Sequence, residues 1–237
     1  MKHELDETSW QWPTQVESRI PLLAPGSATA QRSVFRNMDR KPRCVIVTGR
    51  PGSGKTTLAK KLGERLWMPV ISRDEIKEGY VNTYGLRHDE LPPDTNGLVS
   101  ELFFGMVNQY LVSKVSVVIE AAFQHKVWEP RMSKIMELGS PWIVLCSTDE
   151  SVAARRHLQR GLENPNRELF HSDNRVSHFR KTGEVLSPEC YAAPKFDVPT
   201  IRVSTDGEYV PGIDEIVKQI QSQVDYDPAP AAEAKLT

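Results

Sequence analysis

Gly49-Arg-Pro-Gly-Ser-Gly-Lys-Thr56 is the stretch that decides the fold, because it fits the pattern G-x-x-x-x-G-K-[ST] at every fixed position. An apolar, β-branched run at residues 44–48 precedes it, and leucines at helical spacing follow it over residues 55–67. Glycines let successive backbone N–H groups curl round a phosphate, and the helix N-terminus adds a partial positive charge. The stretch therefore predicts a Walker A P-loop that binds ATP (or GTP) with Mg²⁺.

Two side chains of this loop have specific expected roles. We expect Lys55 to reach the β- and γ-phosphates and the Thr56 hydroxyl to ligate Mg²⁺. Thr57 would cap the helix or contact the α-phosphate. The predicted nucleotide-binding residues are Gly49, Pro51, Gly52, Ser53, Gly54, Lys55, Thr56 and Thr57.

Strand and helix patterns alternate on both sides of the loop. This alternation predicts an α/β, three-layer P-loop NTPase fold, with a five-stranded parallel sheet, helices on both faces and a small Arg-bearing lid. We expect the second strand to lie beside the first, capping boxes at Ser72-x-x-Glu75 and Ser147-x-x-Glu150, and one wide apolar helix stripe over residues 98–112. The predicted strands are residues 44–48, 69–71, 115–119, 142–146 and 200–203.

The composition excludes several classes of protein. The 237 residues include 30 Lys and Arg against 31 Asp and Glu, a net charge of -1, which argues against bulk binding to nucleic acid or to an anionic membrane. Three widely spaced cysteines suggest neither a zinc site nor a disulfide framework. The N-terminus does not resemble a signal peptide, and no apolar run is as long as a membrane span. These features indicate a cytoplasmic protein.

Asp74 is the predicted catalytic base. It lies nineteen positions after Lys55 and just beyond the second predicted strand, where a carboxylate could accept the proton of a substrate hydroxyl. The alternative is that Asp74 has no catalytic role and is present only because the helix dipole favours an acidic residue in the first turn of a helix. Arg73 either holds an anionic group of the substrate or is solvated.

Glu120 ends an uncharged apolar strand pattern. This is the place of a Walker-B-type carboxylate that holds a magnesium-bound water, and Ala121 and Ala122 leave room for a ligand. The alternative is a polar residue that marks the end of the strand. We predict Thr56 and Glu120 as the metal-binding residues.

Arginines follow the fourth predicted strand at a spacing of four residues, which places two of them on the same side of a helix. Arg156 and Arg160 share one helix face, and Gly161 is the predicted helix end. The polar stretch 162–167, with Arg167, would form a mobile lid whose arginines neutralise the transferred phosphoryl group. The remaining candidates for substrate binding are Arg131, which could equally be solvated, His171 and Asp173; His88, His125, His157 and His178 receive no chemical role.

With these motifs in place, residues 43–224 resemble the P-loop kinases of the zeta-toxin, polynucleotide-kinase and chloramphenicol-phosphotransferase group, which includes proteins described as AAA family ATPases. The resemblance implies that Asp74 is the base and that Arg156 and Arg160 belong to the lid side. Glu120-Ala-Ala departs from the Asp-x-Thr/Asn of many members. We expect substrate contacts in residues 80–94 and 175–199, which match no motif of the group.

The sequence thus predicts three parts: a flexible leader (1–42), a P-loop kinase domain (43–224) and a disordered C-terminal tail (225–237). The predicted activity is ATP-dependent transfer of the γ-phosphoryl group to a hydroxyl of a small molecule, catalysed by Lys55, Asp74, Arg156 and Arg160. One alternative is a nucleotide-binding regulator or partner-binding ATPase without an acceptor, favoured by Trp10 and Trp12 in the leader. Another is a toxin-type nucleotide-sugar kinase. A nucleic-acid acceptor is not favoured.

Overall fold

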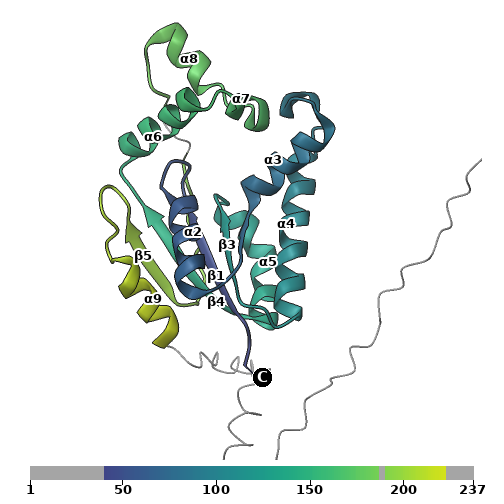
Figure 1. Ribbon diagram of the computed structural model, residues 1–237, viewed down its shortest axis with the longest axis vertical. Helices are drawn as coiled ribbons and strands as arrows, with labels where there is room; N and C mark the ends of the chain where they lie inside the picture. Colours follow the sequence, from purple (N-terminus) through teal and green to yellow (C-terminus); the bar gives the residue numbers. More distant parts are fainter. Residues whose placement is uncertain (1–39, 187–189, 223–237) are drawn as a thin grey trace, which may run out of the picture. The chain divides into compact units, whose positions relative to one another are not determined.

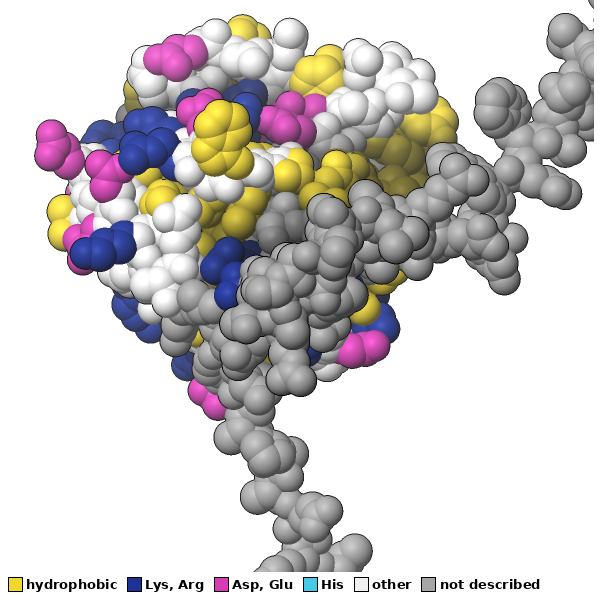
Figure 2. Space-filling view, turned by 60° about the horizontal axis from the view of Figure 1, so that its bottom comes forward, with side chains coloured by type: hydrophobic (Ala, Val, Ile, Leu, Met, Phe, Trp, Pro, Cys, Tyr) yellow, Lys and Arg dark blue, Asp and Glu magenta, His cyan; other side chains and the backbone are white. Residues whose placement is uncertain are grey.

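The structure is a computed structural model that describes residues 40–186 and 190–222 (Figure 1). Most of the predicted leader, including Trp10 and Trp12, lies outside these residues, as does the predicted tail at 225–237, so these two predictions stay predictions. None of the helices within the described residues is both long and apolar enough to span a membrane. On the face of the molecule in Figure 2, basic and acidic side chains of the described residues are interspersed, which accords with the net charge of -1.

Five parallel strands form one sheet in the order β2-β3-β1-β4-β5. The α/β fold with an all-parallel five-stranded sheet is therefore confirmed. The strands are β1 (Arg43–Gly49), β2 (Val70–Ser72), β3 (Val117–Ala121), β4 (Ser140–Ser147) and β5 (Thr200–Ser204). The helices are α2 (Lys55–Leu66), α3 (Arg73–Tyr84), the 3-10 helix η1 (His88–Glu90), α4 (Thr95–Val112), α5 (His125–Leu138), α6 (Glu150–Glu163), α7 (Asn166–His171), α8 (Arg175–Thr182) and α9 (Ile213–Ser222).

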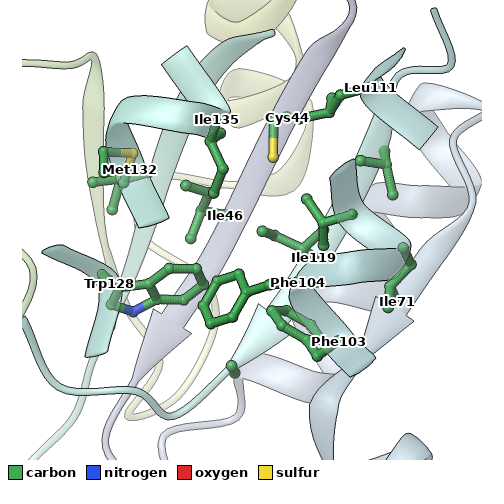
Figure 3. Packing of buried hydrophobic residues seen from close by; sticks show 14 of the residues in the cluster. Cys44, Ile46, Ile71, Phe103, Phe104, Leu111, Ile119, Trp128, Met132 and Ile135 are labelled. Atoms are coloured by element: carbon green, nitrogen blue, oxygen red, sulfur yellow. The ribbon is translucent and has the colours of Figure 1, made fainter. Parts of the chain in front are cut away.

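Successive side chains of β1 enter two different cores, because side chains alternate along a strand. Cys44 and Ile46 pack with Phe103 of α4 and with Trp128 and Ile135 of α5 (Figure 3). On the other face, Val45 and Val47 pack against side chains of α2 and α9. Helices therefore cover both faces of the sheet, as a buried parallel sheet requires.

The predicted order of the first strands is wrong. β3 lies between β1 and β2, and the register pairs Glu120 of β3 with Val47 on one side and with Ser72 on the other. A connection between parallel strands can skip a position in the sheet, so closeness in sequence did not decide which strands pair. The consequence is that Glu120 lies between the P-loop strand and the strand that leads to Asp74.

Both predicted capping boxes are wrong. Ser72 is the N-cap of α3 but makes no capping bond, because its hydroxyl donates to the Glu120 carboxylate at 2.8 Å. Ser147 ends β4, and the N-cap of α6 is Asp149, whose carboxylate accepts the backbone N–H groups of Ser151 and Val152.

Two helices differ from their predicted form. In α4 the predicted stripe is only partly buried, since Leu98, Leu102 and Met106 are more than 40% exposed while Phe103 and Val107 are buried. The α6 helix does not stop at Gly161 but continues to Glu163. Gly161 is instead a packing position, because a Cβ there would come within 2.7 Å of the Val176 side chain of α8. Gly161 is therefore a point of contact between α6 and α8 and not the predicted helix end.

Candidate active site

The P-loop packs closely against the first turns of α6. Gly52 has φ +83°, and a Cβ at this position would lie 2.2 Å from the backbone oxygen of Ala153. Glycine is therefore required there both by its left-handed conformation and by the close approach. Thr205 secures the loop from the other side, since its hydroxyl donates to the Ser53 carbonyl at 2.8 Å.

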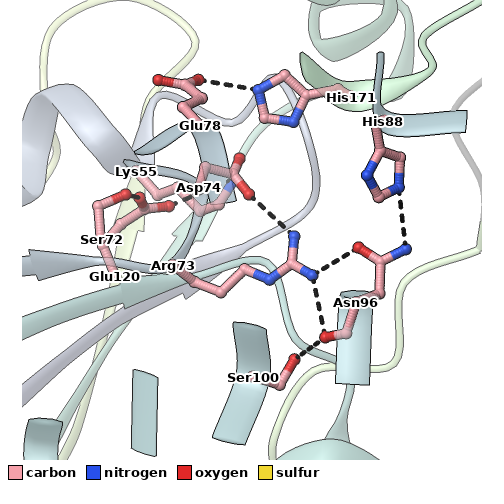
Figure 4. Close-up of polar contacts among 10 residues, drawn as sticks. All are labelled: Lys55, Ser72, Arg73, Asp74, Glu78, His88, Asn96, Ser100, Glu120 and His171. Atoms are coloured by element: carbon pink, nitrogen blue, oxygen red, sulfur yellow. Dashed lines mark hydrogen bonds and ion pairs between the residues drawn. The ribbon is translucent and has the colours of Figure 1, made fainter. Parts of the chain in front are cut away.

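Lys55 and Glu120 form the buried centre of the site (Figure 4). Lys55 Nζ lies 3.7 Å from Glu120 Oε1, and both side chains are less than a tenth exposed. Burial raises the pKa of Glu120, although Lys55 and the Ser72 hydroxyl act in the opposite direction. Oε1 accepts no hydrogen bond from any described residue.

This oxygen, which has Lys55 at 3.7 Å but no hydrogen-bond donor among the described residues, fits a magnesium site. Mg²⁺ prefers oxygen ligands and is often held by one or two protein groups, with waters and nucleotide phosphates completing its shell. Thr56 lines the same cavity as Lys55, and its hydroxyl interacts with Glu120. Thr56 and Glu120 are therefore suited to hold Mg²⁺ as predicted.

Asp74 faces the same cavity from the first turn of α3. Burial alone would raise the pKa of Asp74, but the charges of His171, Lys55, Arg73 and Lys77 together bring it below its ordinary value. The carboxylate is thus ionised at neutral pH and can accept a hydrogen bond from a hydroxyl group. Asp74 reaches the cavity even though β2 does not neighbour β1.

We call this space the P-loop cavity; its volume is about 600 Å³. It brings together predicted residues that are far apart in sequence, with the lid helices α6, α7 and α8 beyond the carboxyl ends of the strands (Figure 1). Among its lining residues are Pro51, Gly52, Lys55, Thr56, Ser72, Asp74, Arg160, Arg167, His171, Asp173 and Arg175.

Arg160 and Arg167 of the lid helices line this cavity, as does Arg175, which is paired with Asp173. Burial and the positive charge of Arg167 lower the pKa of Arg160. The Arg167 Nε atom is buried and has no hydrogen-bond partner among the described residues. Arg160 and Arg167 can therefore each form a charge-assisted hydrogen bond to an anion that lies between them and Lys55.

The lid is held together by Asp173. Its carboxylate lies 2.9 Å from His157 Nε2, accepts the backbone N–H of Arg175 at 3.1 Å and lies 3.6 Å from Arg175 Nε. Burial alone would raise the pKa of Asp173, but the contacts with His157 and Arg175 outweigh burial and lower this pKa to about 2.

A second cavity, of about 370 Å³, lies beside the P-loop between α6 and the loop after β5. We call it the Tyr209 cavity; Gly54, Thr57, Gln159 and Tyr209 line it. Arg156 lines this cavity and not the P-loop cavity. Its guanidinium donates to the backbone oxygens of Thr205 at 2.7 Å and Asp206 at 2.9 Å. Arg160 also lines the Tyr209 cavity, so Arg156 and Arg160 share this cavity, whereas only Arg160 reaches the P-loop cavity as well.

A third cavity, of about 430 Å³, lies between α3, η1 and α7. We call it the η1 cavity. Lys77, His88, Leu91 and Asn96 line it, and it shares His171 and Ser172 with the P-loop cavity. Part of the predicted substrate loop, residues 80–94, thus lines a cavity next to Asp74.

Arg73 and Arg131 both have protein partners. Arg73 lies 3.5 Å from Asp74 and donates to the Asn96 side chain at 2.8 Å (Figure 4). Arg131 forms an ion pair with Glu101 and lies 5.3 Å from the centre of the Phe104 ring, and it lines none of these three cavities. The structure therefore does not bring Arg131 to the site.

Several residues of the site are not among those that the sequence predicts. Lys77 lies one helical turn after Asp74, and this spacing could have placed it near the site. Tyr209 and His157 gave no local signal, because their contacts join segments that are far apart in sequence.

We compared the chain with known protein families and with known proteins. The family model AAA_33, described as an AAA domain, matches residues 44–180. The chain belongs to this AAA-domain family. No curated protein gives a significant match to the sequence.

Solved structures show the same fold as this AAA domain. One, titled a "putative kinase" from Chloroflexus aurantiacus J-10-fl, has a TM-score of 0.65 and 21% identity and covers 78% of this chain and 100% of its own. The APS kinase CysC of Mycobacterium tuberculosis, solved with AMPPNP and APS, has a TM-score of 0.50 and 18% identity, over 77% of this chain and 97% of its own. At these identities the likeness establishes the fold of P-loop kinases.

Proposed function

We propose that this AAA-domain protein is a phosphotransferase that moves the γ-phosphoryl group of ATP (or GTP) to a hydroxyl of a small molecule. The observation that carries the proposal is that Lys55, Asp74 and Arg160 line one cavity. A phosphate-binding cation, an ionised carboxylate and a lid arginine are the groups that in-line phosphoryl transfer requires.

The P-loop side of this cavity would bind the donor. Backbone N–H groups of residues 49–56 would surround the phosphates, and Lys55 would contact the β- and γ-phosphates. Thr56 and Glu120 would hold Mg²⁺, Glu120 through a water molecule. Bound there, Mg²⁺ would supply positive charge that offsets the negative charge of the phosphates.

The Asp74 side would bind the acceptor. Asp74 would accept the hydroxyl proton while the acceptor oxygen forms a bond to the γ-phosphorus, and the bond from that phosphorus to the bridging oxygen of the leaving nucleoside diphosphate breaks. Arg160 and Arg167 would stabilise the negative charge on the transferred group.

The Tyr209 cavity would take the nucleoside. It adjoins Gly54 and Thr57 of the P-loop, and the Tyr209 ring offers a flat surface for a base. Arg156 would act here by fixing the backbone of Thr205 and Asp206, which differs from its predicted contact with the phosphoryl group.

An acceptor screen with γ-labelled ATP tests the proposal. Lys55→Ala should lower nucleotide affinity and abolish transfer, whereas Asp74→Asn should retain nucleotide binding and lower transfer by about 10²–10⁴-fold, the usual contribution of a general base. Asp214→Asn is the matched control, because Asp214 is 81% exposed on α9. Full transfer by Asp74→Asn would exclude Asp74 as the base.

The same screen separates the alternatives. ATP turnover that no hydroxyl compound changes would favour a regulator or partner-binding ATPase. The narrower resemblance to the zeta-toxin and polynucleotide-kinase group remains a prediction, and growth arrest on expression that Lys55→Ala relieves would support a toxin-type kinase.

A further inference from the structure

Lys77 is a buried cation without a contacting counter-ion. Its side chain lines the η1 cavity, and the residue is only 5% exposed. Among the described residues, no carboxylate oxygen lies within 4.0 Å of the Lys77 ammonium group, and none accepts a hydrogen bond from it. Burial and the neighbouring charge of Arg73 lower the pKa of Lys77 to about 8, so it is still mostly protonated at neutral pH. The ammonium nitrogen itself is accessible from the cavity, so a ligand there can supply the acceptor that the described residues do not.

The acidic groups around Lys77 already have partners. Asp74 and Glu78 on α3 interact with Lys77 at longer range, and Asp89 lines the same cavity. Each of the three has a closer cationic or histidine partner. The pairs are Asp74 with Arg73 (3.5 Å), Glu78 with His171 (2.9 Å) and Asp89 with Arg87 (3.1 Å). Among the described residues, each of these carboxylates is thus engaged by a closer partner, and none of them forms an ion pair with Lys77.

His88 supplies a second donor that lacks an acceptor. Arg73 donates to Asn96 Oδ1 at 2.8 Å, and this bond fixes the orientation of the Asn96 amide (Figure 4). Asn96 Nδ2 then faces His88 Nε2 at 3.4 Å, so Nε2 accepts and the ring proton lies on Nδ1. His88 Nδ1 is buried and has no partner within the described residues.

The η1 cavity is large enough for part of a small molecule. Its volume of about 430 Å³ exceeds what one ion requires, and Leu91, Pro92 and Pro93 give it an apolar wall. It meets the P-loop cavity at His171 and Ser172. Lys77 follows Asp74 by three residues, which separates them by about 4.5 Å along the helix axis. A short molecule can therefore contact both residues.

We infer that the acceptor is a small hydroxyl compound with an anionic group, a phosphate or a carboxylate, which Lys77 and His88 bind in the η1 cavity while its hydroxyl lies at Asp74. The inference rests on the proposed phosphotransferase function. Arg73 adds a further positive charge near Lys77, although its guanidinium is occupied by Asp74 and Asn96.

A binding experiment tests the anion site without catalysis. The full-length protein is saturated with Mg²⁺ and a non-hydrolysable ATP analogue, so that the P-loop is filled, and is then titrated by NMR with inorganic phosphate or with acetate. We expect saturable binding of one of the two anions, and the one that binds distinguishes a phosphate from a carboxylate on the acceptor. Lys77→Met should weaken this binding by about 10–100-fold, the usual effect of removing a charge-assisted hydrogen bond.

The controls separate a local effect from a general one. Lys126→Met removes an exposed lysine of α5 that lines none of the three cavities, and it should bind the anions as the wild type does. Lys77→Arg should bind more tightly than Lys77→Met, because it retains the charge. All variants should bind the ATP analogue normally and unfold cooperatively. Wild-type anion binding by Lys77→Met, or no saturable binding of either anion, would overturn the inference.

An activity experiment links the anion to the acceptor. Transfer from labelled ATP is compared for glycerol, glycerate and glycerol 3-phosphate, and for ribose and ribose 5-phosphate. We expect transfer to charged members only, and Lys77→Met should raise KM for them with a much smaller change in kcat and in KM for ATP. Equal transfer to neutral members would overturn the inference while the proposed kinase activity stands. Transfer to no compound of either kind would contradict the proposed function itself, and with it the assignment of the anion to an acceptor.

Discussion

Asp173 joins the lid helices through contacts that require its negative charge. The carboxylate is 11% exposed and lies against His157 of α6 and the first residue of α8. Its pKa falls from an ordinary 3.8 to about 2. At 1.36 kcal/mol per pKa unit, this difference corresponds to about 2 kcal/mol of folding free energy at neutral pH. Asp173→Asn should remove about this amount.

The sign of the pH dependence follows from the lowered pKa. Above the unfolded-state pKa near 4, the folded and unfolded carboxyl groups are both ionised and the stabilisation is complete. As the pH falls from about 4 to 2, the unfolded state takes up a proton first, so the stabilisation is lost. The free-energy difference between wild type and Asp173→Asn should therefore be fully present at pH 5 and should shrink below pH 4.

Urea unfolding at several pH values measures this difference, and amide hydrogen exchange locates it. We expect faster exchange in α7 and α8 of Asp173→Asn, and Asp214→Asn serves as an exposed control. A difference of the same size at pH 7 and pH 3 would refute the assignment to ionised Asp173. The assignment would also be refuted if Asp173→Asn were as stable as the wild type at pH 7.

Three further substitutions test the site and the core. Gly52→Ala should abolish nucleotide binding in a fluorescent-nucleotide titration, because its Cβ would meet the Ala153 backbone at 2.2 Å in a left-handed conformation. Thr205→Val should cost about 1–3 kcal/mol in urea unfolding and weaken nucleotide binding, since it removes the buried hydrogen bond to the Ser53 carbonyl. Trp128→Ala should cost about 3–5 kcal/mol, because the indole is fully buried among the aromatic side chains of α4. A cost below about 1 kcal/mol would contradict this packing.

The local parts of the site could be predicted from the sequence. The P-loop is contiguous, and its residue types follow from the needs of one phosphate chain, so the pattern predicts strand, loop and helix together. The fold class follows from the alternation of strands and helices. Neither inference requires knowledge of which segments meet in space.

The remaining parts depend on long-range contacts. The position of β3 between β1 and β2 leaves no local pattern, so the strand order was predicted incorrectly. The Ser72 hydroxyl was expected to cap its own helix, but a buried carboxylate 48 residues away competes for it. Arg131 was a candidate for substrate binding because the sequence does not show that Glu101 and Phe104 lie beside it.

The η1 cavity has an evolutionary consequence. The loop of residues 85–94 lines this cavity but contributes no residue to the P-loop cavity or the Tyr209 cavity. Under the proposed function, mutations in that loop would change what is recognised beside Asp74 and would leave the residues proposed to bind the donor unaltered. This separation would make the proposed kinase modular: exchange of this one short loop between relatives would transplant acceptor preference, because the lining of the P-loop cavity and of the Tyr209 cavity stays the same.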